Sequence, residues 1–335
     1  MKSPITGKAM IIKHELIEHE FRKEKFDILY HYYLCKDSGE KFEDERLTQL
    51  NLSQVYNQYR NRHNLPFPEE IISLREQYDL SPAKMSEVLG FGINVYRNYE
   101  AGEIPNSSNA RLIQLAQDPK EFRKLVELSN ALNDKELDKV MKKIDQLLLK
   151  EDLIGFNLTS YLMGDLKADE QTGYRKPNLE KFTEMVVFFT QESQPNLWKT
   201  KINKMLFYAD FLNFKKEVQS ISGCRYRAID MGPVPNNFNS LFDHIAKNDH
   251  IDIIVTSFPN GSIGEQFTQN KKRGFDKTKL TSNEIETLIE VDAKFKKVKT
   301  NEIIEISHKE EAWAKNFKGG KKLISYIDAF NLVNI

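Results

Sequence analysis

The chain has 335 residues, more than one hydrophobic core usually organises, so we expect two or three domains. Its 49 basic and 49 acidic side chains give a formal net charge of zero, which excludes a global attraction to nucleic acid or membranes and leaves only local patches. Two cysteines, Cys35 and Cys224, exclude a disulfide framework, and no apolar run is long enough to span a bilayer, so we expect a cytoplasmic protein.

The pattern of residues 1–66 predicts a small β-rich domain that ends in a helix. Alternate positions from 26 to 34 are apolar, as in a half-buried strand, and residues 9–21 can pair with this strand in antiparallel orientation. Residues 43–63 carry apolar side chains at helical spacing, with acids in the first turn and bases in the last. Two prolines directly after this helix predict a domain boundary.

Residues 67–133 are expected to form a second domain of five short helices. Ser81 has the position of an N-cap and Pro82 that of a first helical residue, so we predict a helix over 82–89. A turn with two glycines then allows a sharp reversal, and the next helix is expected over 93–100. This spacing is typical of a helix-turn-helix in which the second helix recognises DNA.

The expected solvent face of that second helix carries side chains that read base edges. Arg97 can pair with guanine, and Asn94 or Asn98 can pair with adenine. Lys84 and Arg111 could contact phosphates. The alternative is a helical bundle in which these residues are only a solvated face. The predicted DNA-contacting residues are Ser81, Lys84, Ile93, Asn94, Val95, Arg97 and Asn98.

The segment from 69 to 117 resembles the XRE/Cro family of DNA-binding domains. The resemblance depends on Leu89-Gly90 before the turn and on Tyr99-Glu100-Ala101-Gly102 after it. It implies a repressor that binds operator DNA, which we expect to act as a homodimer on a palindrome.

Two short motifs flank the predicted N-terminal strands and have the spacing of zinc knuckles. They are Ser3-Pro4-Ile5-Thr6-Gly7 and Cys35-Lys36-Asp37-Ser38-Gly39-Glu40. A structural zinc site needs four thiolate or imidazole ligands, which hydroxyls cannot replace. We therefore expect hydrogen bonds and apolar packing, rather than a metal, to hold these motifs.

Together with the helix-turn-helix, this layout resembles the antitoxin family of MqsA, over residues 1 to about 125. That family joins an N-terminal zinc ribbon with two Cys-x-x-Cys pairs to an XRE domain. This sequence keeps a cysteine at only one of the four ligand positions, Cys35. We expect no metal and no cofactor, although a site formed by Cys35 with His14, His19 or His31 stays open.

Residues 134–178 are expected to contain an amphipathic helix, from Asp134, and a polar linker over 164–178 with two glycines and a proline. Residues 179–335 then mix helical and strand patterns, which predicts a third domain of α+β type. Helices are predicted at 179–192, 199–216, 236–248 and 281–296, and short strands around 221–230 and 251–258.

The most distinctive motifs of the third domain lie at Lys204–Asp210, Gly223–Tyr226 and in the rigid turn Gly232–Pro235. They resemble the signature of the Panacea, or SocA-like, domain. The resemblance implies an antitoxin module that binds and neutralises a separate toxin protein, usually encoded beside it. The corresponding toxin-binding or signature residues are Lys204, Phe207, Tyr208, Asp210, Arg225, Tyr226, Gly232, Pro233 and Pro235.

Without the family, the same residues could form a catalytic cleft, a partner surface or a structural network. In the structural interpretation, Phe207 and Tyr208 pack in the core, and Asp210 forms a buried ion pair with Arg225 that joins helix to strand. Periodicity alone does not choose among these.

Cofactor and hydrolase signatures are missing, and the run at 319–323 lacks the spacing of a phosphate-binding loop. Histidines with neighbouring acids could support acid-base chemistry or bind a metal. These are His244, His250 and His308 with Asp243, Asp249 and Glu310.

The sequence therefore predicts a non-enzymatic antitoxin that neutralises a toxin and represses its own operon. The alternative is a helix-turn-helix regulator whose C-terminal domain senses a ligand or partner protein. A third class is an enzyme fused to a DNA-binding module.

Overall fold

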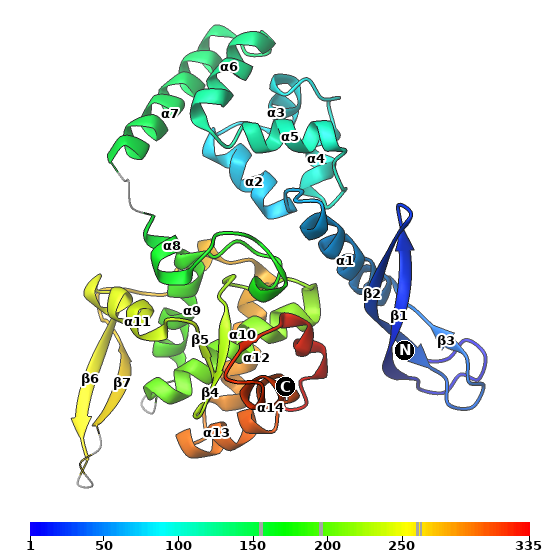
Figure 1. Ribbon diagram of the computed structural model, residues 1–335, viewed down its shortest axis with the longest axis vertical. Helices are drawn as coiled ribbons and strands as arrows, with labels where there is room; N and C mark the ends of the chain where they lie inside the picture. Colours follow the sequence, from blue (N-terminus) through cyan, green and yellow to red (C-terminus); the bar gives the residue numbers. More distant parts are fainter. Residues whose placement is uncertain (154–156, 194–196, 259–260, 262) are drawn as a thin grey trace. The chain divides into compact units, whose positions relative to one another are not determined.

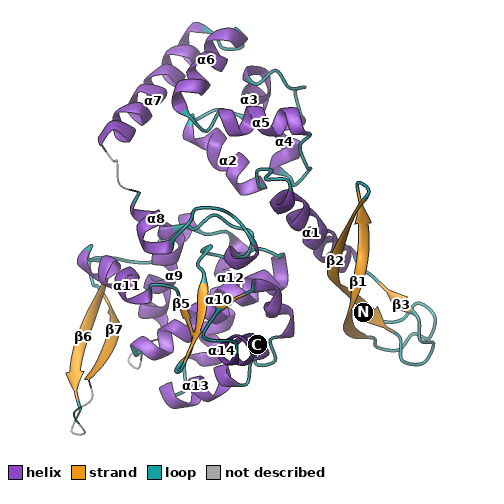
Figure 2. Ribbon diagram, viewed as in Figure 1, coloured by secondary structure: helices purple, strands orange, loops and turns teal. Residues whose placement is uncertain are grey.

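A computed structural model describes residues 1–153, 157–193, 197–258, 261 and 263–335 (Figure 1). The fold is α+β and mostly helical, as predicted (Figure 2). The chain forms two compact units, of which one combines residues 1–55 with 158–335 and the other comprises residues 56–157. Among the described residues, no helix is both long and apolar enough to cross a membrane.

The N-terminal part of the first unit is built on a long antiparallel hairpin. Strands β1 (Ile11–Phe21) and β2 (Glu24–Leu34) pair along their whole length, and β3 (Lys41–Phe42) adds two residues to the other side of β2. Helix α1 (Glu45–Arg62) follows. The predicted strand pairing and helix are confirmed, and the apolar alternation of β2 coincides with burial at Phe26 and Ile28.

Side-chain amides of α1 close the part of β2 that β3 leaves unpaired. Asn51 accepts from the backbone N–H of His31 at 2.8 Å and donates to its carbonyl at 2.9 Å. Gln54 makes the same pair of bonds with Leu29, at 3.0 and 2.9 Å. These four bonds satisfy backbone groups that would otherwise form a free sheet edge.

The second unit is helical and has its own core. Its helices after α1 are α2 (Pro68–Gln77), α3 (Pro82–Val88), α4 (Val95–Glu100), α5 (Ser107–Leu115), α6 (Pro119–Ser129) and α7 (Asp134–Leu153). Ser81 caps α3 by accepting from the backbone N–H of Lys84 at 3.2 Å, and Pro82 occupies the first helical position, both as predicted.

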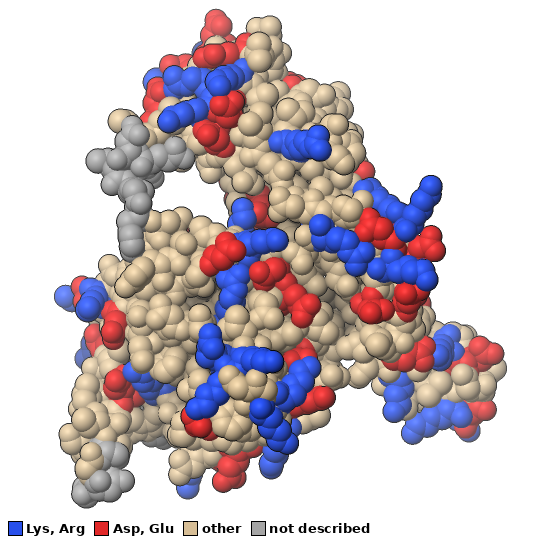
Figure 3. All heavy atoms as spheres, in the orientation of Figure 1, with Lys and Arg blue, Asp and Glu red and all other residues tan. Residues whose placement is uncertain are grey.

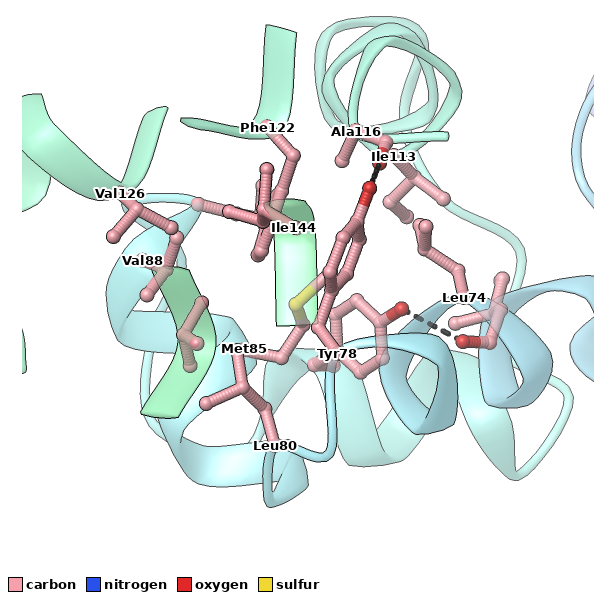
Figure 4. Close-up of a cluster of buried hydrophobic side chains, with 14 of the residues drawn as sticks. Leu74, Tyr78, Leu80, Met85, Val88, Ile113, Ala116, Phe122, Val126 and Ile144 are labelled. Carbon is pink, nitrogen blue, oxygen red and sulfur yellow. Dashed lines mark hydrogen bonds between the residues drawn. The ribbon is translucent and has the colours of Figure 1, made fainter. Parts of the chain in front are cut away.

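The core of this unit is closed by Tyr78 and by helix α7. Tyr78 stacks on Phe122 and donates to the carbonyl of Ala116 at 2.9 Å (Figure 4). Val140 and Ile144 of α7 are buried in the same cluster. Helix α7 is therefore part of this core. Leu115 of α5 lies outside this core, since 44% of this residue is exposed.

The C-terminal part of the first unit is organised around one buried helix, α10 (Lys199–Glu217), whose residues from 201 to 214 are all buried. A helix that is covered on every side must sit at the centre of its domain. Around it lie helices α9 (Leu179–Glu192), α12 (Ser282–Phe295), α13 (Thr300–His308) and α14 (Glu311–Lys318), and a small sheet of order β5-β4-β8. The strands of this sheet are β4 (Tyr226–Ile229), β5 (Gly232–Pro235) and β8 (Leu323–Ile324).

A two-stranded hairpin, β6 (Ile251–Ser257) with β7 (Ile263–Gln269), projects from the domain beside α11 (Phe238–Lys247) (Figure 1). The four helices and the two strand regions predicted for this part are confirmed within a few residues. The sequence did not predict α13, α14, β7 and β8. The segment Gly232–Pro235, predicted as a turn, is the edge strand β5, where prolines cost no ladder hydrogen bond.

The prediction of a polar linker at 164–178 is wrong. Tyr174 and Arg175 are buried, and the Arg175 guanidinium donates to the carbonyl of Ser220 at 2.6 Å and to Glu284 at 2.7 Å. Lys181 also contacts Glu284 at 2.7 Å. Composition suggested a linker because the segment is polar, but Arg175 pairs with Glu284 and Asp169 pairs with Arg225, both far along the chain.

Candidate functional site

The signature of the C-terminal domain centres on Asp210, a fully buried carboxylate of α10. It accepts hydrogen bonds from the backbone N–H groups of Ile221 and Ser222, both at 2.8 Å. It also accepts from the hydroxyls of Ser222 at 2.5 Å and Tyr226 at 2.8 Å. Burial raises the pKa of Asp210, and these donors act in the opposite direction. The carboxylate thus fastens the loop before β4 to the central helix.

Arg225 does not pair with Asp210, and the predicted ion pair between them is wrong. Its guanidinium instead contacts Asp169 at 3.1 Å and the carbonyl of Asp165 at 2.9 Å. Adjacent residues at the start of a strand point to opposite faces, so only Tyr226 turns toward α10. Arg225 thus joins the strand to the segment that the sequence had suggested as a linker.

Lys204 is the most unusual side chain of the signature. It is completely buried, and its ammonium has no hydrogen-bond acceptor among the described residues. Burial lowers the pKa of Lys204 to about 7. A side chain of this kind is costly, because the charged form has lost its hydration without gaining a partner.

Gly232 lies directly above Lys204. Its φ of +96° favours glycine, and a Cβ built there would lie 2.6 Å from Cε of Lys204 and 2.5 Å from Oγ of Ser307. The start of β5 therefore approaches α10 and α13 closely, which only glycine permits. Pro233 and Pro235 of the same strand are buried.

The remaining signature residues complete an aromatic core. Tyr208 stacks on Phe295 and donates to Glu310 at 3.1 Å, and Phe207 packs on Phe211 and Tyr226. Burial is the main cause that raises the pKa of Tyr208. In this structure the signature is thus the interior of the domain, as the structural interpretation of Phe207 and Tyr208 expected. Apart from Arg225, which is half-buried, the signature residues are buried.

The residues predicted to contact DNA have the opposite placement. Ile93, Asn94, Arg97 and Asn98 are exposed on α4 and the turn before it, while Val95 is half-buried. Tyr96 and Tyr99 face inward, and the hydroxyl of Tyr96 donates to the carbonyl of Ile71 at 2.7 Å. The recognition helix was predicted to begin near Ile93 and end near Glu100, and α4 begins at Val95 and ends at Glu100.

Lys84, the predicted phosphate contact on α3, is already engaged within its own unit. Its ammonium donates to Glu87 at 2.9 Å and to the carbonyl of Ala131 at 3.0 Å. Nζ of Lys84 also lies 3.7 Å from Oε2 of Glu136. The hydrogen bond to Glu87 is the main cause that raises the pKa of Lys84. Contact with a phosphate would require Lys84 to exchange these partners.

The two N-terminal knuckles come together as their spacing predicted. Oγ of Ser3 accepts from the backbone N–H groups of Ile5 and Thr6, both at 3.2 Å, and Oγ1 of Thr6 lies 3.4 Å from Sγ of Cys35. Hydrogen bonds from Ser3, Ser38 and Thr6, in that order, lower the pKa of Cys35 to about 6. Hydroxyls and one buried thiol thus occupy the centre of the knuckles.

The histidines considered for catalysis have separate surroundings. His244 contacts Asn248 in α11, whereas Nδ1 of His250 accepts from Nε of Arg273 at 3.2 Å. His308 stacks on Trp313 with ring centroids 3.9 Å apart. Within the part of the chain that the structure describes, no group of three or more His, Cys, Asp or Glu residues is arranged to hold a metal.

A pocket of about 540 Å³ lies between α9, α11 and the segment after β7. His250, Arg273 and Glu184 line it, and Arg273 forms an ion pair with Glu184. Burial, followed by the charge of Arg273, lowers the pKa of His250. Sequence analysis had considered His244 and His250, but it could not place Glu184 and Arg273 beside them, because the pocket residues come from segments up to about 120 positions apart.

Comparison with known families identifies the C-terminal domain. Residues 202–314 match the family model described as Antitoxin SocA-like, Panacea domain. The chain therefore carries a C-terminal Panacea domain, as its signature predicted. No curated protein matches the chain. The match does not extend to residues 1–133, where the resemblances to the XRE/Cro and MqsA families stay predictions.

Proposed function

We propose that this protein is an antitoxin that neutralises a cognate toxin protein by direct binding through its Panacea domain. The match of residues 202–314 to an antitoxin domain carries this proposal. The matched segment runs from within the central helix α10 to within α14 and contains the signature, most of which is buried. We propose no turnover of a substrate.

Co-expression tests the proposal directly. The product of the gene beside this one is expressed alone and then with the full chain. We expect growth arrest in the first case, and rescue together with co-purification of the two proteins in the second. If the neighbouring product does not inhibit growth, or if it inhibits growth and the full chain neither rescues the cells nor co-purifies, then direct neutralisation is wrong.

We also propose that α3 and α4 bind operator DNA and repress the chain's own operon. The exposed side chains Asn94, Arg97 and Asn98 support this, since amides and guanidinium groups recognise adenine and guanine edges. The segment 67–133 has only seven basic residues against ten acidic ones. Operator binding would therefore depend more on base contacts than on phosphate contacts, and its salt dependence would be shallow.

Operator binding is tested with Arg97→Ala and with Lys120→Ala as a control from an exposed position on α6. Arg97→Ala should weaken binding to the chain's own promoter by about 1–3 kcal/mol, while Lys120→Ala should have little effect. Toxin binding should not change in either variant. Equal promoter binding by the two variants would contradict the proposal.

A second candidate function is supported by the pocket at His250 and Arg273. A regulator that senses a small ligand would need such a depression with a few polar groups. This alternative predicts that promoter binding responds to a metabolite extract and that the chain has no growth-inhibiting neighbour. An unchanged footprint in the presence of the extract would exclude it.

A further inference from the structure

The surface around α14 is rich in basic side chains. We define the α14 surface as residues 308–322 with Met231 and Arg227. The segment 308–322 contains five lysines and two glutamates, and one of these glutamates, Glu310, is buried. The hairpin segment 251–270 of the same domain contains only two charged residues, both acidic. Figure 3 shows blue side chains gathered over the region that Figure 1 labels α14.

Most cations of this surface have no carboxylate partner. Lys315 pairs with Asp328 and Lys321 with Asp230, both at 2.5 Å. Exposed cations without a carboxylate within 4.0 Å in the described part of the chain are Arg227, Lys309, Lys318 and Lys322. Clustered like charges repel one another, so this arrangement does not favour the isolated fold.

Glu310 cannot compensate these charges, although it lies within the same segment. It accepts from the hydroxyl of Tyr208 at 3.1 Å, from the backbone N–H of Val333 at 3.0 Å and from the amide of Asn334 at 2.8 Å. Its carboxylate is therefore engaged in the interior of the domain. The positive charge of the surface stays available to a partner.

The same surface has a rigid aromatic centre. Trp313 stacks on His308 at 3.9 Å and on Phe317 at 4.7 Å, and its Nε1 donates to the carbonyl of Ile229 at 2.9 Å. This bond fastens the turn between β4 and β5, on which Met231 is 49% exposed. Aromatic residues and methionine are enriched at protein interfaces, and a polar rim commonly surrounds them.

We propose that the α14 surface is where the Panacea domain binds its toxin, and that it recognises an acidic surface of the toxin. This inference rests on the proposed antitoxin function and deepens it. The unpaired cations favour an anionic partner, and the fixed aromatic centre with exposed Met231 provides an apolar contact beside them. Single-stranded RNA fits less well, because the rings of Trp313 that would stack on bases are stacked on protein rings.

The test is the double variant Lys318→Glu and Lys322→Glu in the full chain. The matched control is Lys271→Glu with Lys272→Glu, because these lysines after β7 are also exposed and unpaired within the described residues. Association with the purified toxin from the neighbouring gene is measured by stopped flow at low and high salt. We expect association about tenfold slower, with a weaker salt dependence, for the α14 variant only.

Three results would overturn the inference, and they can be distinguished. If the wild-type chain does not bind the toxin, the proposed function and the inference fail together. If both double variants bind the toxin like the wild type, only the choice of surface fails. If a fluorescein-labelled oligouridylate binds the wild type and not the α14 variant, while toxin binding is unchanged, the surface serves RNA. Circular dichroism of both variants confirms that they fold.

Discussion

The sequence motifs of the two units differ in burial: the predicted DNA-contacting residues are mostly exposed, whereas the Panacea signature is mostly buried. In unit 56–157, Asn94 at the N-cap of α4 and Arg97 and Asn98 on this helix are exposed, and their side chains form no hydrogen bond or ion pair with the described residues. In the Panacea domain, Lys204 and Asp210 are completely buried.

The difference teaches what each motif can show. When the residues of a motif are exposed, as the predicted base-reading side chains are, they can contact the ligand directly and so mark the binding site. A buried signature instead identifies the domain, because it specifies how α10 joins β4, β5 and α13, and it leaves the binding surface undetermined. Exposed residues of the domain, such as the lysines of α14, are therefore better candidates for partner choice.

The largest expected effect is on Asp210. Asp210→Ala leaves two backbone N–H groups and two hydroxyls without their acceptor, so it should destabilise the first unit by about 4 kcal/mol. Urea denaturation measures this loss. Asp230→Ala, which removes an exposed partner of Lys321, is the control and should not change the midpoint. A stable Asp210→Ala protein would mean that the signature is not structural.

Lys204→Met should stabilise the domain by about 2 kcal/mol at neutral pH, because it removes a buried ammonium without an acceptor and keeps the volume of the side chain. The pKa of Lys204 is about 7 in the folded state and about 10.4 in an unfolded chain. Between these values the unfolded state binds more protons, so this group makes stability rise with pH.

Thermal melts from pH 7 to 10 test this prediction, and the rise should be smaller in Lys204→Met. The control is Lys201→Met. Because the ammonium of Lys201 donates to the carbonyl of Lys296 at 2.9 Å, this substitution should not stabilise the protein. If Lys204→Met destabilises the protein, the buried lysine has a partner or a role that its surroundings do not explain.

Ser3→Ala should change stability less than the two substitutions above. The knuckle has the spacing of a metal site, but hydrogen bonds of Ser3 hold it together. The change removes the acceptor for the N–H groups of Ile5 and Thr6 and should cost about 1 kcal/mol. It should also raise the pKa of Cys35, which a pH titration of thiol alkylation measures. Ser38→Ala is the exposed control and should affect stability less.

The smallest expected effect on stability is that of Arg97→Ala, which should stay within about 0.5 kcal/mol, because exposed positions without specific contacts tolerate substitution. If Arg97→Ala also weakens promoter binding, then Arg97 acts in binding, whereas Asp210 acts in stability. A large loss of stability would show that Arg97 is structural, and the two motifs would then be alike.

Much of the local structure could be predicted from the sequence. Ser81 and Pro82 marked the start of α3, and apolar alternation located the hairpin of β1 and β2. The prediction failed where chemistry is set by distant partners. The polar segment with Arg175 suggested a linker, but Glu284, 109 positions away, makes it part of the domain.

The sequence by itself therefore determined the local elements and the identity of the Panacea domain, because caps, periodicity and signature residues act over short spacings. Only the tertiary structure decided that Asp210 bonds Tyr226 and not Arg225, and that residues 1–55 belong to one unit with 158–335. Burial and pairing depend on which distant segments pack together, and a buried polar group shows its role only once its partners are in place.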